Sequence, residues 1–115
     1  MDSSLYFDEQ HEQVREMVRA FAQEHVAPMA KALDRDQEFP WANIKTMGEL
    51  GILGVPWPEE VGGAGLDQVS YYLTIHELAK VDASHALTVS AHTNLGTSPL
   101  MDFGTPAQKE RYVPL

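Results

Sequence analysis

The run Pro58-Glu59-Glu60-Val61-Gly62-Gly63-Ala64-Gly65-Leu66-Asp67 decides how this chain folds, because it separates two helical patterns and at first suggests a nucleotide-binding loop. Phosphate-binding loops have the spacing G-x-G-x-x-G or G-x-x-x-x-G-K-[ST], and they place backbone N–H groups on the phosphate at the start of a helix. Neither spacing occurs here, and Glu59 and Glu60 would repel a phosphate. We therefore interpret the run as a tight connection between two helices, in which glycine supplies positive φ and Asp67 caps the helix that follows.

Helical periodicity precedes this connection. From Asp8 to residue 33, apolar residues recur in steps of three and four, which predicts an amphipathic helix with Asp8 as its N-cap. Pro28 should kink this helix or divide it in two, because proline removes a backbone donor. After a solvated break over residues 34–38, Pro40 begins a short helix that Gly51 ends.

Further helices are expected beyond the glycine run. Asp67 to Val81 is apolar on two sides, which is typical of a mostly buried helix. Thr105 and Gln108 make a capping box with Pro106 at the first helical position, so another helix begins at Thr105. Since no run alternates with period two, we expect an all-α fold without β-sheet, an orthogonal or up-and-down bundle of about five helices.

The stretch between Asp82 and Asp102 has an unusual composition, since none of its 19 residues is Asp, Glu, Lys or Arg. An uncharged segment of this length raises the question of a membrane span. Its histidines, serines, threonines, asparagine and proline make it too polar to span a bilayer. We expect a helix that is buried inside the protein and lined with small residues.

The composition is that of one acidic domain covering residues 1–115. Its 17 acidic and 8 basic residues give a formal net charge of -9, which argues against nucleic acid or anionic lipid as a partner. The chain has no cysteine, so disulfides and Cys-ligated zinc are excluded, and a reducing compartment is compatible. The amino terminus shows no secretory signal pattern, and we expect a cytoplasmic protein.

Familiar catalytic motifs are missing from the sequence. His76-Glu77-Leu78-Ala79-Lys80 resembles the start of a zinc-protease helix, but Lys80 stands where the second histidine is needed. His85 and His92 are seven residues apart and could share a helix face, either as hydrogen-bonded core histidines, which we favour, or as metal ligands. No Gly-x-Ser-x-Gly elbow anchors nucleophilic catalysis.

Five pieces of sequence nonetheless occur in an order that resembles a known family. They are Asp34-Arg35 through Glu38-Phe39-Pro40, Gly51-Ile52-Leu53-Gly54, the glycine run, Glu77-Leu78-Ala79, and Gly104-Thr105-Pro106-Ala107-Gln108-Lys109-Glu110-Arg111-Tyr112. Together they resemble the amino-terminal α-helical domain of the acyl-CoA dehydrogenase family over essentially the whole chain. Ser90-Ala91-His92-Thr93-Asn94-Leu95 is most similar to the corresponding helix of short- and branched-chain members such as isovaleryl-CoA dehydrogenase.

The resemblance implies an activity to which this chain contributes only a part. Members of the family use FAD to oxidise an acyl-CoA thioester to the 2,3-enoyl-CoA: a glutamate removes the α proton, and the flavin accepts a hydride from the β carbon. In the family, that glutamate belongs to a carboxyl-terminal helical domain. The flavin lies between that domain, a middle β-domain and a neighbouring subunit.

Several expectations follow from this division of the family's enzymes. Within residues 1–115 we expect no catalytic, flavin-binding or metal-binding residue, and neither retained FAD nor activity in this piece alone. The base glutamate is expected beyond Leu115. The full-length enzyme is expected to be a homo-oligomer, a dimer or tetramer, that passes its electrons to an electron-transfer flavoprotein.

The resemblance also gives the uncharged segment a role, as one wall of the pocket that holds the acyl chain. By their positions in the motif, Thr88, Ala91, His92 and Leu95 are expected to contact the acyl chain. Small Ala91 would leave room in the pocket, and His92 would take room away. Taken alone, small residues on an inner helix equally suit the close packing of neighbouring helices.

Two other functions are compatible with the sequence. Acyl-CoA oxidases, nitroalkane oxidases and flavin monooxygenases of the same superfamily begin with the same domain, so residues beyond Leu115 decide the reaction type. Alternatively, the chain is a stand-alone helical interaction module without chemistry. The last helix has barely begun at Leu115, which favours a piece of a longer enzyme over a module.

Overall fold

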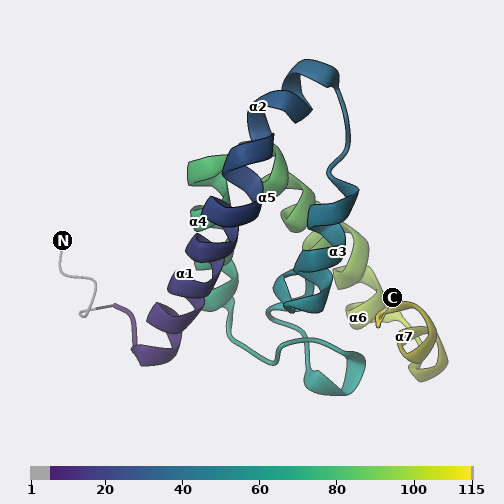
Figure 1. The fold of residues 1–115 in the computed structure, drawn as a ribbon. Helices are drawn as coiled ribbons and strands as arrows, with labels where there is room; N and C mark the ends of the chain where they lie inside the picture. The colour runs from purple at the N-terminus through teal and green to yellow at the C-terminus, as the bar shows by residue number, and fades with distance from the viewer. Residues whose placement is uncertain (1–5, 115) are drawn as a thin grey trace.

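The computed structural model describes residues 6–114, and every regular element among them is helical (Figure 1). The α-helices are α1 (Glu9–Phe21), α2 (Ala27–Asp36), α3 (Trp41–Glu49), α4 (Gln68–Val81), α5 (Ala83–Ser90), α6 (Ser98–Phe103) and α7 (Pro106–Tyr112). Two π-helical segments, η2 (Ala22–Val26) and η5 (Ala91–Thr97), join α1 to α2 and α5 to α6. Two 3₁₀ turns, η3 (Ile52–Gly54) and η4 (Glu59–Val61), lie between α3 and α4. The π-helical segments continue into the α-helices around them, so the elements make five helical rods, and the predicted all-α bundle is confirmed.

The rods pack as a thin slab. The molecule measures 41 × 40 × 19 Å, so its smallest dimension is about two helix diameters. Helix α4 has the most extensive packing, since it lies against α1 on one side and α5 on another. Helices α6 and α7 form the carboxyl-terminal corner (Figure 1). A slab this thin leaves most helices with one face turned outward.

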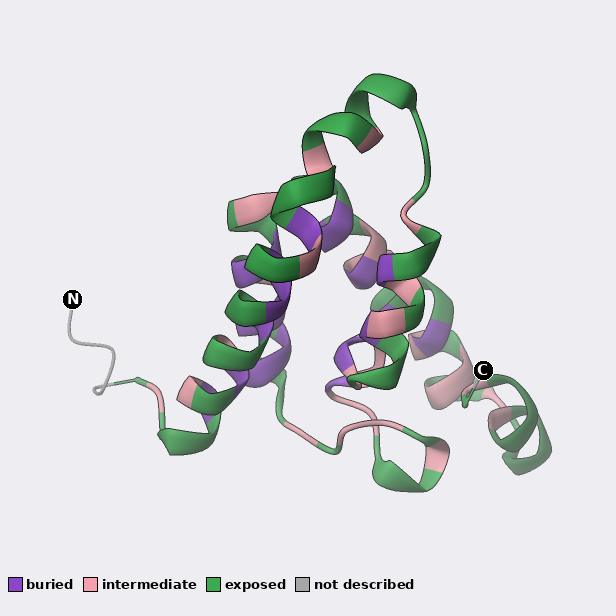
Figure 2. Ribbon diagram, viewed as in Figure 1, coloured by how far each residue is buried: buried purple, intermediate pink, exposed green. Residues whose placement is uncertain are grey.

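The core is the set of apolar side chains between these rods, and its buried residues appear in purple in Figure 2. Helix α1 and the segment η2 contribute the largest share of the core, through apolar residues that recur every three or four positions. The buried apolar cluster comprises Val14, Val18, Phe21, Ala22, Val26, Met47, Ile52, Leu78, Ala86 and Val89. The amphipathic stripe predicted over residues 8–33 therefore faces the core along α1 and η2, whereas α2 has no buried residue.

Side-chain caps begin four of the helices. The predicted N-caps Asp8, Asp67 and Thr105 are confirmed, and each accepts a hydrogen bond from the backbone N–H three residues on, at 2.8–3.2 Å. Asp82 caps α5 in the same way, at 3.3 Å. These oxygens satisfy N–H groups that have no partner within the helix.

The glycine run is a tight connection, as predicted. Gly62 has φ +87°, and a Cβ on Gly63 would lie 2.1 Å from the carbonyl oxygen of Trp57, so side chains at these two positions are strongly disfavoured. The Gly65 N–H donates to that same carbonyl at 2.8 Å and closes the loop. The chain then enters α4 at its cap, Asp67.

Three local predictions were wrong. The charged residues 34–38 do not interrupt the helix at once, because α2 is exposed to solvent there and continues to Asp36. Leu50, expected to share one face with Ile44 and Met47 in the helix between Pro40 and Gly51, follows the end of α3 and is exposed. Helix α4 is buried on fewer sides than predicted, since Val69 and Tyr72 point to solvent on the side that no neighbouring helix covers.

Both π-helical segments lie just ahead of a proline. Pro28 and Pro99 lack an N–H, so the carbonyls four residues earlier, those of Glu24 and Leu95, have no α-helical donor. A wider π turn forms around each of these carbonyls. The prediction that Pro28 kinks the first helix or divides it in two is met by η2 between α1 and α2, and the uncharged segment, expected as one helix, is interrupted in the same way by η5 ahead of Pro99.

None of the helices within residues 6–114 has the length and apolarity needed to cross a bilayer.

Candidate functional site

Helix α5 and segment η5 have an inward and an outward side. The inward side is buried and includes His85, Val89, Thr93 and Thr97. The outward side carries Leu87 and Leu95, whose exposed fractions are 70% and 78%. The expectation of a wholly buried helix was therefore wrong, because the thin slab covers this rod from one side only.

Three of the four residues predicted to contact an acyl chain lie on the outward side. Thr88, Ala91 and Leu95 are separated by three and four residues; the first two are half-buried and Leu95 is exposed. The Thr88 hydroxyl donates to the backbone carbonyl of Ser84 at 2.8 Å, so its hydrogen is used within the helix. The outward side therefore presents mainly carbon atoms and no charge.

Leu87 belongs to the same outward side, although sequence reasoning missed it. It lies four residues before Ala91 and eight before Leu95, which is the spacing of one helix stripe. That spacing was the available signal. Together, Leu87, Ala91 and Leu95 define what we call the outward stripe.

His92 lies at the edge of this surface, where it lines a small cleft of about 90 Å³. The cleft is bordered by glycines of the turn η3 and of the glycine run, among them Gly51, Gly54 and Gly63. Pockets for small molecules have volumes of about 300–1,000 Å³, so the cleft is too small for an acyl chain. The outward stripe is therefore an open wall, which the described residues do not enclose.

His85 is a hydrogen-bonded core histidine, the alternative that the sequence favoured, whereas His92, for which the same was expected, is exposed. Its Nδ1 lies 2.5 Å from Asp82, and its Nε2 lies 3.2 Å from the side-chain nitrogen of Asn43, which also donates to the His25 carbonyl. Burial raises the pKa of Asp82, but hydrogen bonds from His85 and Ser84 outweigh it and leave that pKa below its ordinary value. Within residues 6–114, no three His, Cys, Asp or Glu side chains gather as a metal site.

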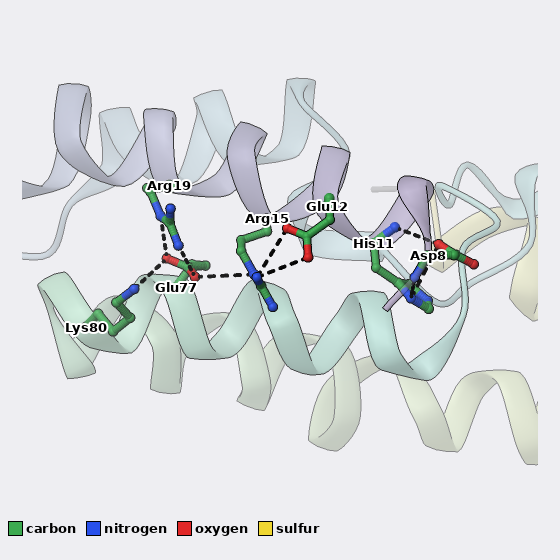
Figure 3. Close-up of polar contacts among 7 residues, drawn as sticks. All are labelled: Asp8, His11, Glu12, Arg15, Arg19, Glu77 and Lys80. Atoms are coloured by element: carbon green, nitrogen blue, oxygen red, sulfur yellow. Dashed lines mark hydrogen bonds and ion pairs between the residues drawn. The ribbon is translucent and has the colours of Figure 1, made fainter. Parts of the chain in front are cut away.

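A cluster of charged side chains ties α1 to α4 (Figure 3). Glu77 is only 3% exposed, and it accepts hydrogen bonds from Arg19 at 3.1 and 3.2 Å and from Lys80 at 3.2 Å. Arg15 approaches the same carboxylate at 3.9 Å. Burial raises the pKa of Glu77, yet the bonds from Arg19 and Lys80 outweigh it and leave the pKa lowered. The carboxylate that the zinc-protease comparison singled out thus stabilises helix packing.

His11 links the caps of the same two helices. Its Nδ1 accepts the backbone N–H of Asp8 at 3.1 Å, so Nε2 carries the ring hydrogen and donates to Asp67 at 2.7 Å. This bond, with that from the Ser70 N–H, lowers the pKa of Asp67 to about 2. The starts of α1 and α4 are therefore held together by one imidazole (Figure 3 shows its contact with Asp8).

The described residues do not by themselves make a flavin site. A flavin pyrophosphate needs backbone N–H groups and positive charge, whereas the glycine run carries Glu59 and Glu60 and lacks the required spacing. Among residues 6–114, the buried side-chain polar atoms without a hydrogen-bond partner are Trp57 Nε1 and Ser70 Oγ, which belong to different parts of the fold and form no cradle. No step involving flavin is therefore assigned to these residues.

The fold and the outward stripe define a class of protein: an all-α domain that presents one uncharged, open helix face. A family model described as "Acyl-CoA dehydrogenase, N-terminal domain" matches residues 8–115. The chain belongs to this family, as the sequence predicted.

Curated relatives agree with this assignment. The chain is 42% identical over 110 residues to an acyl-CoA dehydrogenase of Bacillus subtilis (strain 168), covering 96% of this chain and 29% of the relative. It is 44% identical over 107 residues to the short-chain specific acyl-CoA dehydrogenase of Clostridium acetobutylicum, covering 92% and 28%. It is 41% identical over 114 residues to the mitochondrial isovaleryl-CoA dehydrogenase of Arabidopsis thaliana, covering 97% and 28%. The chain thus spans less than a third of the length of these relatives.

Solved structures share the fold. A chain in the structure named for the electron transferring flavoprotein of Acidaminococcus fermentans superposes with a TM-score of 0.92 at 37% identity, covering 99% of this chain and 30% of that one. The acyl-CoA dehydrogenase of Bacillus anthracis complexed with FAD superposes with a TM-score of 0.88 at 33% identity, covering 96% and 19%.

Proposed function

We propose that the full-length protein is an FAD-dependent acyl-CoA dehydrogenase that oxidises an acyl-CoA thioester to the 2,3-enoyl-CoA, and that the outward stripe forms one wall of its acyl-chain pocket. The observation that carries this proposal is the pair Leu87 and Leu95, which are 70% and 78% exposed on a segment without any charged residue. Solvated helix faces normally carry charges, so an apolar stripe of this kind favours a surface that another group covers. The family membership supplies the acyl-CoA as that group.

In the proposed enzyme, the chemical steps and the binding of the acyl chain involve different parts of the protein. Proton removal and hydride transfer are assigned to residues outside residues 1–115, and this domain is not expected to retain FAD alone. Its residues contribute binding and the exclusion of water. Ala91 on the stripe and Thr88 beside it leave space for the chain, Leu87 and Leu95 supply apolar contact, and His92 limits the space at one edge.

The proposal extends to the partners and location of the whole protein. We include an electron-transfer flavoprotein as the acceptor of the enzyme's electrons. In support of this, a chain in the structure named for the electron transferring flavoprotein of Acidaminococcus fermentans has the same fold as this domain. A homo-oligomer and a cytoplasmic location are part of the same proposal, and a chain segment without cysteine is compatible with a reducing compartment.

Ala91→Phe in the full-length protein tests the proposed wall. The ring would fill space beside the acyl chain, so kcat/KM for long acyl-CoAs should fall by about tenfold or more while that for short ones changes little. Initial rates over a series of chain lengths measure this. Ala107→Phe on the exposed side of α7 is the matched control and should leave the series unchanged. Equal loss at every chain length would remove the proposed role of the stripe.

A further inference from the structure

The π-helical segment η5 gives the outward stripe its shape. A π turn holds one residue more than an α turn, and Leu95 lies inside it because the proline at position 99 leaves the Leu95 carbonyl without an α-helical donor. If the segment relaxed to α geometry, each residue beyond the wide turn would rotate by about 100° about the helix axis. In α geometry each four-residue step turns by about 40°, so Leu87 and Leu95, eight residues apart, would lie about 80° apart about the helix axis and no longer in one line.

Side-chain hydrogen bonds hold this segment at three points. The Thr93 hydroxyl donates to the Leu53 carbonyl at 2.9 Å, and the Thr97 hydroxyl donates to the His92 carbonyl at 2.9 Å. The third bond comes from the side-chain amide of Asn94, which donates to the hydroxyl of Tyr71 on α4, also at 2.9 Å. Of the three, the bond to Tyr71 is the one that fixes η5 to the long central helix.

Tyr71 is well suited to hold the segment in position. Its side chain is only 2% exposed, so the ring cannot move without disturbing the core. The neighbouring tyrosine, Tyr72, is 62% exposed. Of these two adjacent tyrosines, Tyr71 is therefore the one whose place on the buried side of α4 lets it bond to Asn94. Asn94 itself is exposed, so its side chain would be free to leave if the tyrosine hydroxyl did not hold it.

We infer that Tyr71 and Asn94 are positioning residues that keep η5 in its π-helical register and thereby keep Leu95 in line with Leu87 on one acyl-facing wall. This inference rests on the proposed function and deepens it. Neither residue belongs to the outward stripe; they act through the backbone between Ala91 and Leu95. Their effect should therefore appear in substrate binding and in local backbone protection, and not in the chemical step.

Tyr71→Phe in the full-length protein is the central experiment, because it removes one oxygen atom and keeps the ring. Losing one hydrogen bond should raise KM for the preferred acyl-CoA by about two- to tenfold with kcat nearly unchanged. Hydrogen–deuterium exchange of the peptide covering residues 91–97 should become faster by a similar factor. Tyr72→Phe is the matched control and should change neither quantity.

Asn94→Ala provides the second arm. If the two side chains act through one bond, the double variant Tyr71→Phe/Asn94→Ala should be no worse than either single variant in KM and in exchange. Additive effects would overturn the inference, and so would unchanged exchange over residues 91–97 in Tyr71→Phe.

The exchange measurement separates this inference from the proposed function. Faster exchange with an unchanged KM at every chain length would overturn the positioning role in substrate binding. The Ala91→Phe series would still decide whether the stripe is an acyl wall. Failure of that series together with faster exchange would remove the acyl wall, and with it the substrate role of Tyr71 and Asn94.

Discussion

The contact between α1 and α4 and the outward side of α5 and η5 are built from opposite kinds of residue. Between α1 and α4, Glu77 and His11 find all their partners within the chain. On the outward stripe, Leu87 and Leu95 are left largely exposed by the described residues. The first region stabilises the domain itself, whereas the second contributes little to stability and is therefore free to serve binding. Changes in the two regions should accordingly separate loss of stability from loss of function.

The largest effect on stability is expected from Glu77→Ala. Removing a buried carboxylate leaves the cations of Arg19 and Lys80 without their partner, and breaking a buried ion pair costs about 3–5 kcal/mol when both partners are buried. Since both cations are half-exposed and can turn to solvent, we expect a loss of about 2–3 kcal/mol in the free energy of unfolding. Urea denaturation of this domain measures it. Glu16→Ala, on the solvent side of α1, is the control and should change stability by less than about 0.5 kcal/mol. Equal effects of the two substitutions would contradict the assigned role of Glu77.

A smaller, pH-dependent effect is expected from Asp67→Asn. The folded-state pKa of Asp67 is lowered from 3.8 to about 2, so its ionised form stabilises the fold above pH 3.8, and this contribution is lost as the pH falls through 2. Because the side chain is 52% exposed, we expect about 1 kcal/mol. Asparagine still caps α4, so the cap itself is kept. Urea midpoints should differ at pH 6 and converge near pH 2; a difference that is constant over this range would exclude the carboxylate as its source.

The smallest effect on stability is expected from Leu95→Ala. Because this side chain is mostly exposed, its truncation should change the free energy of unfolding by less than about 0.5 kcal/mol. Val89→Ala, on the buried side of the same rod, is the matched control and should cost about 2 kcal/mol. Thermal unfolding of the two variants measures the contrast. A large loss for Leu95→Ala would mean that the outward stripe is part of the domain's own core.

Much of the fold could be predicted from local patterns. Asp8, Asp67 and Thr105 signalled helix starts because N-capping depends on residues only three apart in sequence. Pro28 signalled the division of the first rod for the same local reason. The exposure of Tyr72 and Leu95 could not be predicted, because periodicity identifies apolar sides without showing how many of them neighbouring helices cover.

The candidate site was predicted less completely than the fold. Thr88, Ala91 and Leu95 were placed on one side by resemblance alone, and their contact with an acyl chain stays a prediction. The bond between Tyr71 and Asn94 joins residues 23 positions apart, and no local pattern connects them. Leu87 was missed because the resemblance pointed to its neighbour Thr88, although the spacing of Leu87 from Ala91 and Leu95 was available in the sequence.

The contacts between α1 and α4 can form only after both helices have been synthesised. Arg19 and Glu77 are 58 residues apart, so α1 is synthesised well before its partner helix. At about 5–20 residues per second, the interval is about 3–12 seconds, whereas helices form within microseconds. During that time Val14 and Val18, which α1 buries in the finished domain, are exposed on the nascent chain. Until α4 has been synthesised, the first helix is therefore the part of this domain that is most open to aggregation.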